Sequence, residues 1–180
     1  MRIEINRKNM KNLRIRAENG IIKISAPQNM SYEKIMEIYN ENEKKIEDLA
    51  KRDMEKKSYD NKLFGEDFES DLKGKALEDF YREKFYQIIP EISRKYEEMT
   101  GLYAKEYRVR KMKARWGTCY PQRGLIILAL NLAKRPIDEI ESVVLHEIIH
   151  LKYKNHSKDF YREIEKYMPN YFEIHKRLNS

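Results

Sequence analysis

The sequence of 180 residues has a single cysteine, Cys119, and no apolar run long enough to cross a membrane. One thiol excludes a fold held by internal disulfides and is typical of a reducing compartment. The longest apolar stretch, residues 125–130, is far shorter than the ~20 residues that a membrane helix needs. The first residues also lack the apolar core of a secretory signal. We therefore expect a cytoplasmic protein without a membrane partner.

Acidic residues are scarce in one part of an otherwise mixed, highly charged chain. Charged residues make up 37% of the sequence, and the net charge is +7. Between Lys105 and Arg123 seven lysines and arginines face one acid, Glu106. Such a basic 105–123 strip favours an anionic partner such as nucleic acid, although a solvated strand face would have the same composition.

The N-terminal part has the pattern of a small sheet followed by a helix. Apolar residues alternate between residues 2 and 26, and Glu18-Asn19-Gly20 is typical of a hairpin turn. Ser31 is a suitable N-cap for an amphipathic helix that continues to about Arg52. Residues 53–75 show no sustained period and are interpreted as a connecting segment with a short strand at 62–64. This predicts an N-terminal β-hairpin and helix module over residues 1–60.

The remaining residues, 76–180, predict a catalytic core of helices around a few strands. Pro90 falls inside the first helical pattern, so we expect a kink or a split there. A change of parity between Val109 and Met112 indicates a β-bulge near residues 110–111 in one long strand. The expected elements are a helix at 76–99 closed by Gly101, strands at 107–119 and 125–130, a buried helix at 137–151, and helices at 157–168 and 171–178.

Histidine is also rare, since the chain has only four, yet three of them fall between residues 146 and 156. His146 and His150 are four residues apart in an HExxH motif, so on a helix their rings share one face and reach the same metal ion. Glu147 lies beside them, where a carboxylate can take a proton from a metal-bound water. His156 is a candidate third ligand. The motif predicts a zinc hydrolase with an open fourth position on the metal.

Several motifs together resemble one known family. Arg-Trp-Gly-Thr-Cys at 115–119, Asn131 after the apolar strand, His-Glu-Ile-Ile-His at 146–150 and Asn-His-Ser at 155–157 resemble the YgjP-like metallopeptidases, relatives of SprT-like and minimal-zincin proteins. The resemblance is strongest over residues 104–169. It implies an α+β fold in a single domain, 1–180, whose zincin-like core packs a small mixed sheet on the active-site helix. It also implies one Zn²⁺ per chain and peptide or protein substrates.

The third metal ligand has two candidate sources. The resemblance implies His156, together with His146, His150 and the catalytic Glu147. Metzincins have the same histidine spacing, but they carry a glycine where this chain has Tyr153, and that glycine turns the chain toward the third histidine. The alternative is a carboxylate on the next helix, Glu163 or Glu165, as in gluzincins.

The remaining candidates have both a functional and a structural interpretation. Arg115 and Trp116 either line the substrate cleft or serve as a solvent charge and a packed ring. Cys119 is interpreted as an ordinary strand residue, and His175 as a surface histidine. A second hypothesis is a nucleic-acid-associated module, similar to SprT-like proteins, in which the zinc is structural and the basic strip binds the partner.

Overall fold

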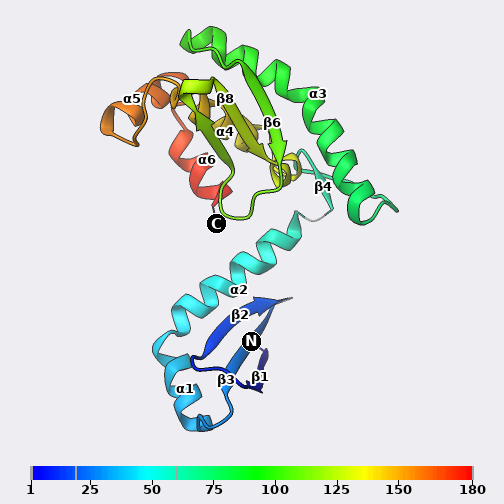
Figure 1. Ribbon diagram of the computed structural model, residues 1–180, viewed down its shortest axis with the longest axis vertical. Coiled ribbons are helices and arrows are strands. Elements are labelled where there is room, and N and C mark those ends of the chain that lie inside the picture. Colours follow the sequence, from blue (N-terminus) through cyan, green and yellow to red (C-terminus); the bar gives the residue numbers. More distant parts are fainter. Residues whose placement is uncertain (1, 19, 60, 180) are drawn as a thin grey trace. The chain divides into compact units, whose positions relative to one another are not determined.

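The computed structural model describes residues 2–18, 20–59 and 61–179, which fall into two compact units, Met1–Asp60 and Asn61–Ser180. Figure 1 shows the order of the elements in both units. The first unit contains β1 (Arg2–Lys8), β2 (Arg14–Glu18), β3 (Ile21–Pro27), α1 (Tyr32–Glu41) and α2 (Glu43–Ser58). None of the described helices combines the length and apolar composition that a bilayer span requires.

The sheet of the first unit has the order β1-β3-β2. Strands β2 and β3 are antiparallel, as the predicted hairpin requires, although Asn19 of its turn lies outside the described residues. Strand β1 pairs in parallel with β3. Ile22, Ile24 and Ile35 are completely buried in the small core of this unit.

The prediction of one helix from Ser31 to Arg52 is wrong, because the helix is interrupted at Asn42. The Asn42 side chain donates to the carbonyl of Ile38 (2.9 Å), and its backbone N–H donates to Tyr39 (3.1 Å). An asparagine that bonds its own helix backbone in this way closes the last turn of α1. Ser31 caps that helix as expected, since its hydroxyl accepts from the N–H of Lys34 (3.2 Å).

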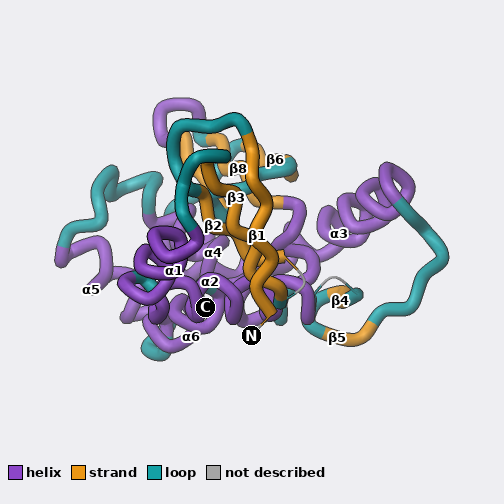
Figure 2. The backbone as a smooth tube through the Cα atoms, turned by 90° about the horizontal axis from the view of Figure 1, so that it is seen from below, coloured by secondary structure: helices purple, strands orange, loops and turns teal. Residues whose placement is uncertain are grey.

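The second unit begins with a two-stranded hairpin and a long helix. Strands β4 (Lys62–Leu63) and β5 (Glu66–Asp67) pair antiparallel, and Figure 2 shows the loop that leads from β5 to α3 (Gly74–Thr100). A kink or a split was expected at Pro90, and the split is absent, since α3 continues as one helix of 27 residues. Ile89 and Ile92 are buried on either side of the proline, so core packing offsets the lost backbone hydrogen bond. Gly101 ends the helix in the left-handed conformation (φ 69°).

The second sheet is mixed and has the order β6-β8-β7. Strand β6 (Glu106–Arg110) is parallel to β8 (Leu125–Ala129), and β7 (Gly117–Tyr120) is antiparallel to it. The predicted single strand over 107–119 with a bulge is therefore wrong. The change of parity marks a loop at residues 111–116 that carries the chain from one edge of the sheet to the other.

Helix α4 (Ile137–Ile149) lies against this sheet, and every residue of β8 is buried. Figure 1 shows α4 behind the strands and α3 beside β6. Two short helices, α5 (Lys158–Tyr167) and α6 (Tyr171–Leu178), pack against α4. Short 3₁₀ segments at Pro121–Arg123 and Leu130–Lys134 complete the unit. The predicted α+β core, a small mixed sheet packed on the helix that carries the histidines, is confirmed.

Candidate active site

The candidate site is built on the last turn of α4. The helix is buried by Ile140, Val144 and Ile148, which are completely inaccessible to solvent. This anchoring fixes the direction in which the polar residues of the last turn leave the helix. His146 and Glu147 belong to the helix, and His150 is its C-cap, with its N–H bonded to the carbonyl of His146 (3.3 Å).

A tight turn after α4 brings His156 back to the first two histidines. The N–H of Tyr153 donates to the carbonyl of Ile149 (2.9 Å), and the carbonyl of Tyr153 accepts from Nδ1 of His150 (2.8 Å). Among the described non-glycine residues only Phe64 has a positive φ, so Tyr153 makes this turn with an ordinary backbone conformation. A glycine at position 153 is therefore unnecessary for this turn.

Three imidazole nitrogens converge at this point. The Nε2 atoms of His146, His150 and His156 lie 3.0–3.1 Å from one another. The carbonyl bonded to Nδ1 of His150 can only accept, so that ring carries its proton on Nδ1 and presents a lone pair from Nε2. Converging lone pairs suit a cation, and neutral imidazole is a ligand that Zn²⁺ prefers. These three side chains therefore fit a metal ion.

Burial favours the neutral form that metal binding requires. Desolvation, and next the charges of the neighbouring histidines, together lower the pKa of His146 to about 3. Desolvation also lowers the pKa of His150, against the opposing effect of its bond to Tyr153. Neutral rings keep their lone pairs available near neutral pH.

Glu147 is buried beside the three histidines, under strand β7. Desolvation raises its pKa to about 8, while the charge of Arg115 and a hydrogen bond from the backbone N–H of Cys119 act in the opposite direction. Gly117 leaves the space that the carboxylate occupies. A carboxyl group with a pKa near neutrality can both accept and return a proton.

A cleft of about 810 Å³ opens over these groups. Both Arg115 and Trp116 line it, together with residues 117–119 of β7 and the three histidines. Trp116 is also held from the other side, since its Nε1 donates to Asn179 (3.2 Å) and the Arg135 guanidinium lies 5.0 Å from its ring. Trp116 therefore both lines the cleft and serves as a packed ring, the two interpretations that the sequence left open.

The alternative carboxylate ligands lie elsewhere. Glu163 accepts from Lys166 (2.6 Å) and from the Tyr167 hydroxyl (3.3 Å), and Glu165 is exposed on α5. In the described part of the chain, His146, His150 and His156 form the one group of three potential ligands that converges closely enough for a metal ion.

Two residues of this region were missed by sequence reasoning. His175 is half-buried and lines the cleft, so the expectation of a surface histidine is wrong. Tyr171 is completely buried and bonds Nδ1 of His146 (2.7 Å). The two are four residues apart on α6, which places them on one helix face, and this spacing was the available signal. Cys119 also lines the cleft, and burial raises the pKa of its thiol to about 12.

A helix carrying His-Glu-x-x-His under the edge of a mixed sheet, with a third histidine returned by a turn, is the arrangement expected of a metallopeptidase domain. The model of the YgjP-like metallopeptidase domain matches residues 47–180. The chain therefore belongs to the YgjP-like metallopeptidase family, whose name implies a metal-dependent protease.

The chain is also similar to a solved structure. The crystal structure of the metallopeptidase zymogen of Pyrococcus abyssi abylysin is similar, with 25% sequence identity and a TM-score of 0.47. The match covers 50% of this chain and 90% of that chain. No curated protein matches the sequence.

Proposed function

We propose that the protein is a zinc-dependent peptidase that holds one Zn²⁺ per chain on His146, His150 and His156. The observation that carries this proposal is the convergence of the three Nε2 atoms, 3.0–3.1 Å apart, next to a buried glutamate. When bound, zinc supplies a polarised water and polarises the scissile carbonyl. The single cysteine, a half-buried free thiol, is consistent with a protein that functions in the reducing cytoplasm.

Glu147 acts as the general base and then as the general acid in this proposal. It takes the proton of the attacking water and returns it to the leaving amine. Arg115 and the N–H of Cys119 favour the carboxylate that accepts the proton, and burial favours the carboxylic acid that returns it. The balance between these effects suits a group that must work in both directions.

Strand β7 is the expected binding edge for an extended peptide. Within its sheet β7 pairs with β8 alone, and Gly117, Thr118 and Cys119 line the cleft. A substrate strand can therefore add to β7 through backbone hydrogen bonds. Arg115 and Lys154 line the same cleft, so we expect acidic side chains in preferred substrates.

The test compares wild-type protein with Glu147→Gln, both loaded with zinc, on a proteome-derived peptide library. New peptide termini read by mass spectrometry are expected from the wild type only. Glu165→Gln is the matched control, because it removes an exposed carboxylate of α5 and should cleave normally. Wild-type cleavage rates in zinc-loaded Glu147→Gln, or no cleavage by the wild type, would contradict the proposal.

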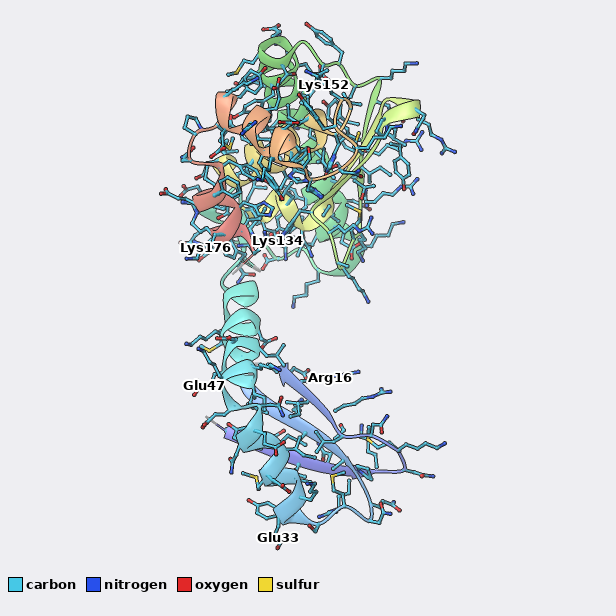
Figure 3. All side chains as sticks on the ribbon, turned by 90° about the vertical axis from the view of Figure 1, so that its left-hand side faces the viewer. Arg16, Glu33, Glu47, Lys134, Lys152 and Lys176 are labelled. Carbon is cyan, nitrogen blue, oxygen red and sulfur yellow. The ribbon has the colours of Figure 1, made fainter. Side chains whose placement is uncertain are left out.

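A second candidate function is association with nucleic acid, as a SprT-like protein or as a module with a structural zinc. It is favoured by the 105–123 strip, in which all seven basic side chains are exposed. Two of them are ion-paired, Arg108 with Glu106 and Lys111 with Glu78. Basic residues also occur well outside the strip, as Lys134, Lys152 and Lys176 on three other segments of the second unit illustrate (Figure 3).

Salt dependence separates this candidate from a peptidase acting on free peptides. Binding through phosphates should weaken steeply with salt and be lost when Lys111, Lys113 and Arg115 are replaced by alanine, with the zinc content unchanged. A structural zinc also needs a fourth protein ligand, whereas the described residues offer a group of three. Salt-independent binding, or no binding, would contradict this candidate.

A further inference from the structure

Helix α6 places two side chains in a line behind the first candidate ligand. The Tyr171 hydroxyl lies 2.7 Å from Nδ1 of His146 and 3.2 Å from Nδ1 of His175. The Tyr171 and His175 rings are nearly parallel, with centroids 5.2 Å apart. His175 reaches the cleft, whereas Tyr171 is completely buried. The three groups form a continuous chain of hydrogen bonds from the cluster of histidines to the cleft.

The direction of the protons in this chain follows from the role proposed for His146. A ring that ligates through Nε2 must carry its proton on Nδ1, so it donates to the Tyr171 oxygen. The Tyr171 hydroxyl can then donate its own hydrogen bond to Nδ1 of His175. Every donor in the chain then has one acceptor.

The rings of the other two candidate ligands, His150 and His156, are held by different hydrogen bonds. Nδ1 of His150 donates to a backbone carbonyl, which no substitution can remove. In the described part of the chain, the hydrogen bonds of His156 involve Nε2 and not Nδ1. The Tyr171 hydroxyl is thus the side-chain group that can select the protonated nitrogen of a candidate ligand.

We propose that Tyr171 and His175 are positioning residues that hold His146 in its metal-binding tautomer. The Tyr171 oxygen accepts a hydrogen bond from Nδ1–H of His146, and His175 keeps the Tyr171 hydroxyl proton turned away from that nitrogen. This inference rests on the proposed metal site, but it concerns zinc affinity and the tautomer of one ring, and not peptide cleavage. It extends the functional site to α6, an element outside the HExxH helix.

The decisive variant is Tyr171→Phe, which keeps the buried ring and removes the oxygen. Zinc affinity, measured by competition with a chromophoric chelator, should fall about 10–100-fold, as is typical when an outer partner of a ligand is lost. ¹⁵N spectra of the metal-free protein should show His146 protonated on Nδ1 in the wild type and mixed between both nitrogens in the variant. Tyr167→Phe is the control, because its hydroxyl contacts Glu163 and no histidine.

His175→Ala provides an independent test if Tyr171→Phe does not fold. Without its acceptor the Tyr171 hydroxyl can rotate and donate to His146, which stabilises the tautomer that cannot bind zinc through Nε2. We expect a smaller, several-fold loss of zinc affinity and the same change in the ¹⁵N spectrum. Unchanged affinity together with an unchanged His146 tautomer in either folded variant would overturn the inference. Loss of zinc affinity in a protein that cleaves no peptide would support the positioning role and reject the peptidase proposal alone.

Discussion

Gly117 of β7 and Glu147 of α4 are so close that a Cβ at position 117 would force the Glu147 side chain to move. A Cβ built on Gly117 would lie 2.5 Å from Oε1 of Glu147 and 2.6 Å from its Cγ. The glycine has no unusual φ, so its role is space and not backbone freedom. The strand crosses directly over the buried carboxylate, which explains why glycine stands between Trp116 and Thr118.

Gly117→Ala should therefore displace the Glu147 carboxylate without removing the metal ligands. Misplacement of a catalytic group by ~1 Å can lower the rate about 100-fold, and we expect at least that loss in kcat. Zinc content, measured by atomic absorption, should stay at the wild-type value. Normal kcat in Gly117→Ala would show that Glu147 has other space available.

Gly101→Ala is the control for replacing a glycine of the same unit. Gly101 has a φ of 69°, and an added Cβ meets nothing within 4 Å. The variant should lose about 1–2 kcal/mol of folding free energy through backbone strain and keep its kcat. Differential scanning calorimetry and peptide cleavage separate the two effects.

The positions of the candidate site residues could be predicted from the sequence better than the bounds of the surrounding helices and strands. His146, Glu147 and His150 could be placed together because helix geometry alone fixes their spacing. Local signals of the same kind identified Ser31 and Gly101 as helix ends. The turn that returns His156 could not be derived, since a hydrogen bond from the His150 ring to the Tyr153 carbonyl stabilises it.

The features that sequence reasoning missed have a local cause at Asn42, whose side chain bonds the Ile38 carbonyl, and causes distant in sequence elsewhere. The break at Asn42 and the loop at 111–116 interrupt patterns that look continuous in one dimension. Tyr171 joins His146 across 25 residues, and no local pattern encodes that contact. For the loop at 111–116 and for Tyr171, contacts with distant residues decide between alternatives that periodicity leaves equal.

His156→Ala should weaken zinc binding more than the ~10–100-fold loss expected for an outer partner, because it removes a proposed ligand itself. Glu163→Gln should bind zinc within about two-fold of the wild type, since Glu163 is bonded to Lys166 and Tyr167. Competition with a chelator measures both constants. A larger loss of zinc affinity in Glu163→Gln than in His156→Ala would identify Glu163 as the third ligand.

Cys119 should react slowly with iodoacetamide in the folded protein. Burial, and next the charge of Glu147, raise the pKa of its thiol to about 12. An acid with a raised pKa stays protonated, and the reactive thiolate becomes abundant only as the pH approaches that value. At pH 8 the native protein should therefore react at least ~10-fold more slowly than the urea-unfolded chain, whose thiol has a pKa of ~8.5. Equal rates, followed by mass spectrometry, would contradict the burial of this thiol.

Ser157 links the stability of α5 to the position of His156. Its hydroxyl accepts from the N–H of Phe160 (3.3 Å) and caps the helix directly after the histidine. Loss of such a cap costs about 0.5–2 kcal/mol, and fraying of the first turn would release the neighbouring ring. Ser157→Ala should therefore lower both the melting temperature and the zinc affinity.

Ser31→Ala is the matched control, since Ser31 caps α1 through the same kind of bond (3.2 Å) in the first unit. It removes a comparable stabilising interaction from a helix that carries none of the three histidines. Calorimetry should show a similar local destabilisation, while chelator competition should give wild-type zinc affinity. Equal affinity losses in both variants would mean that zinc binding follows general stability. A loss confined to Ser157→Ala would mean that the cap places His156, because α5 begins beside this proposed metal ligand and α1 does not.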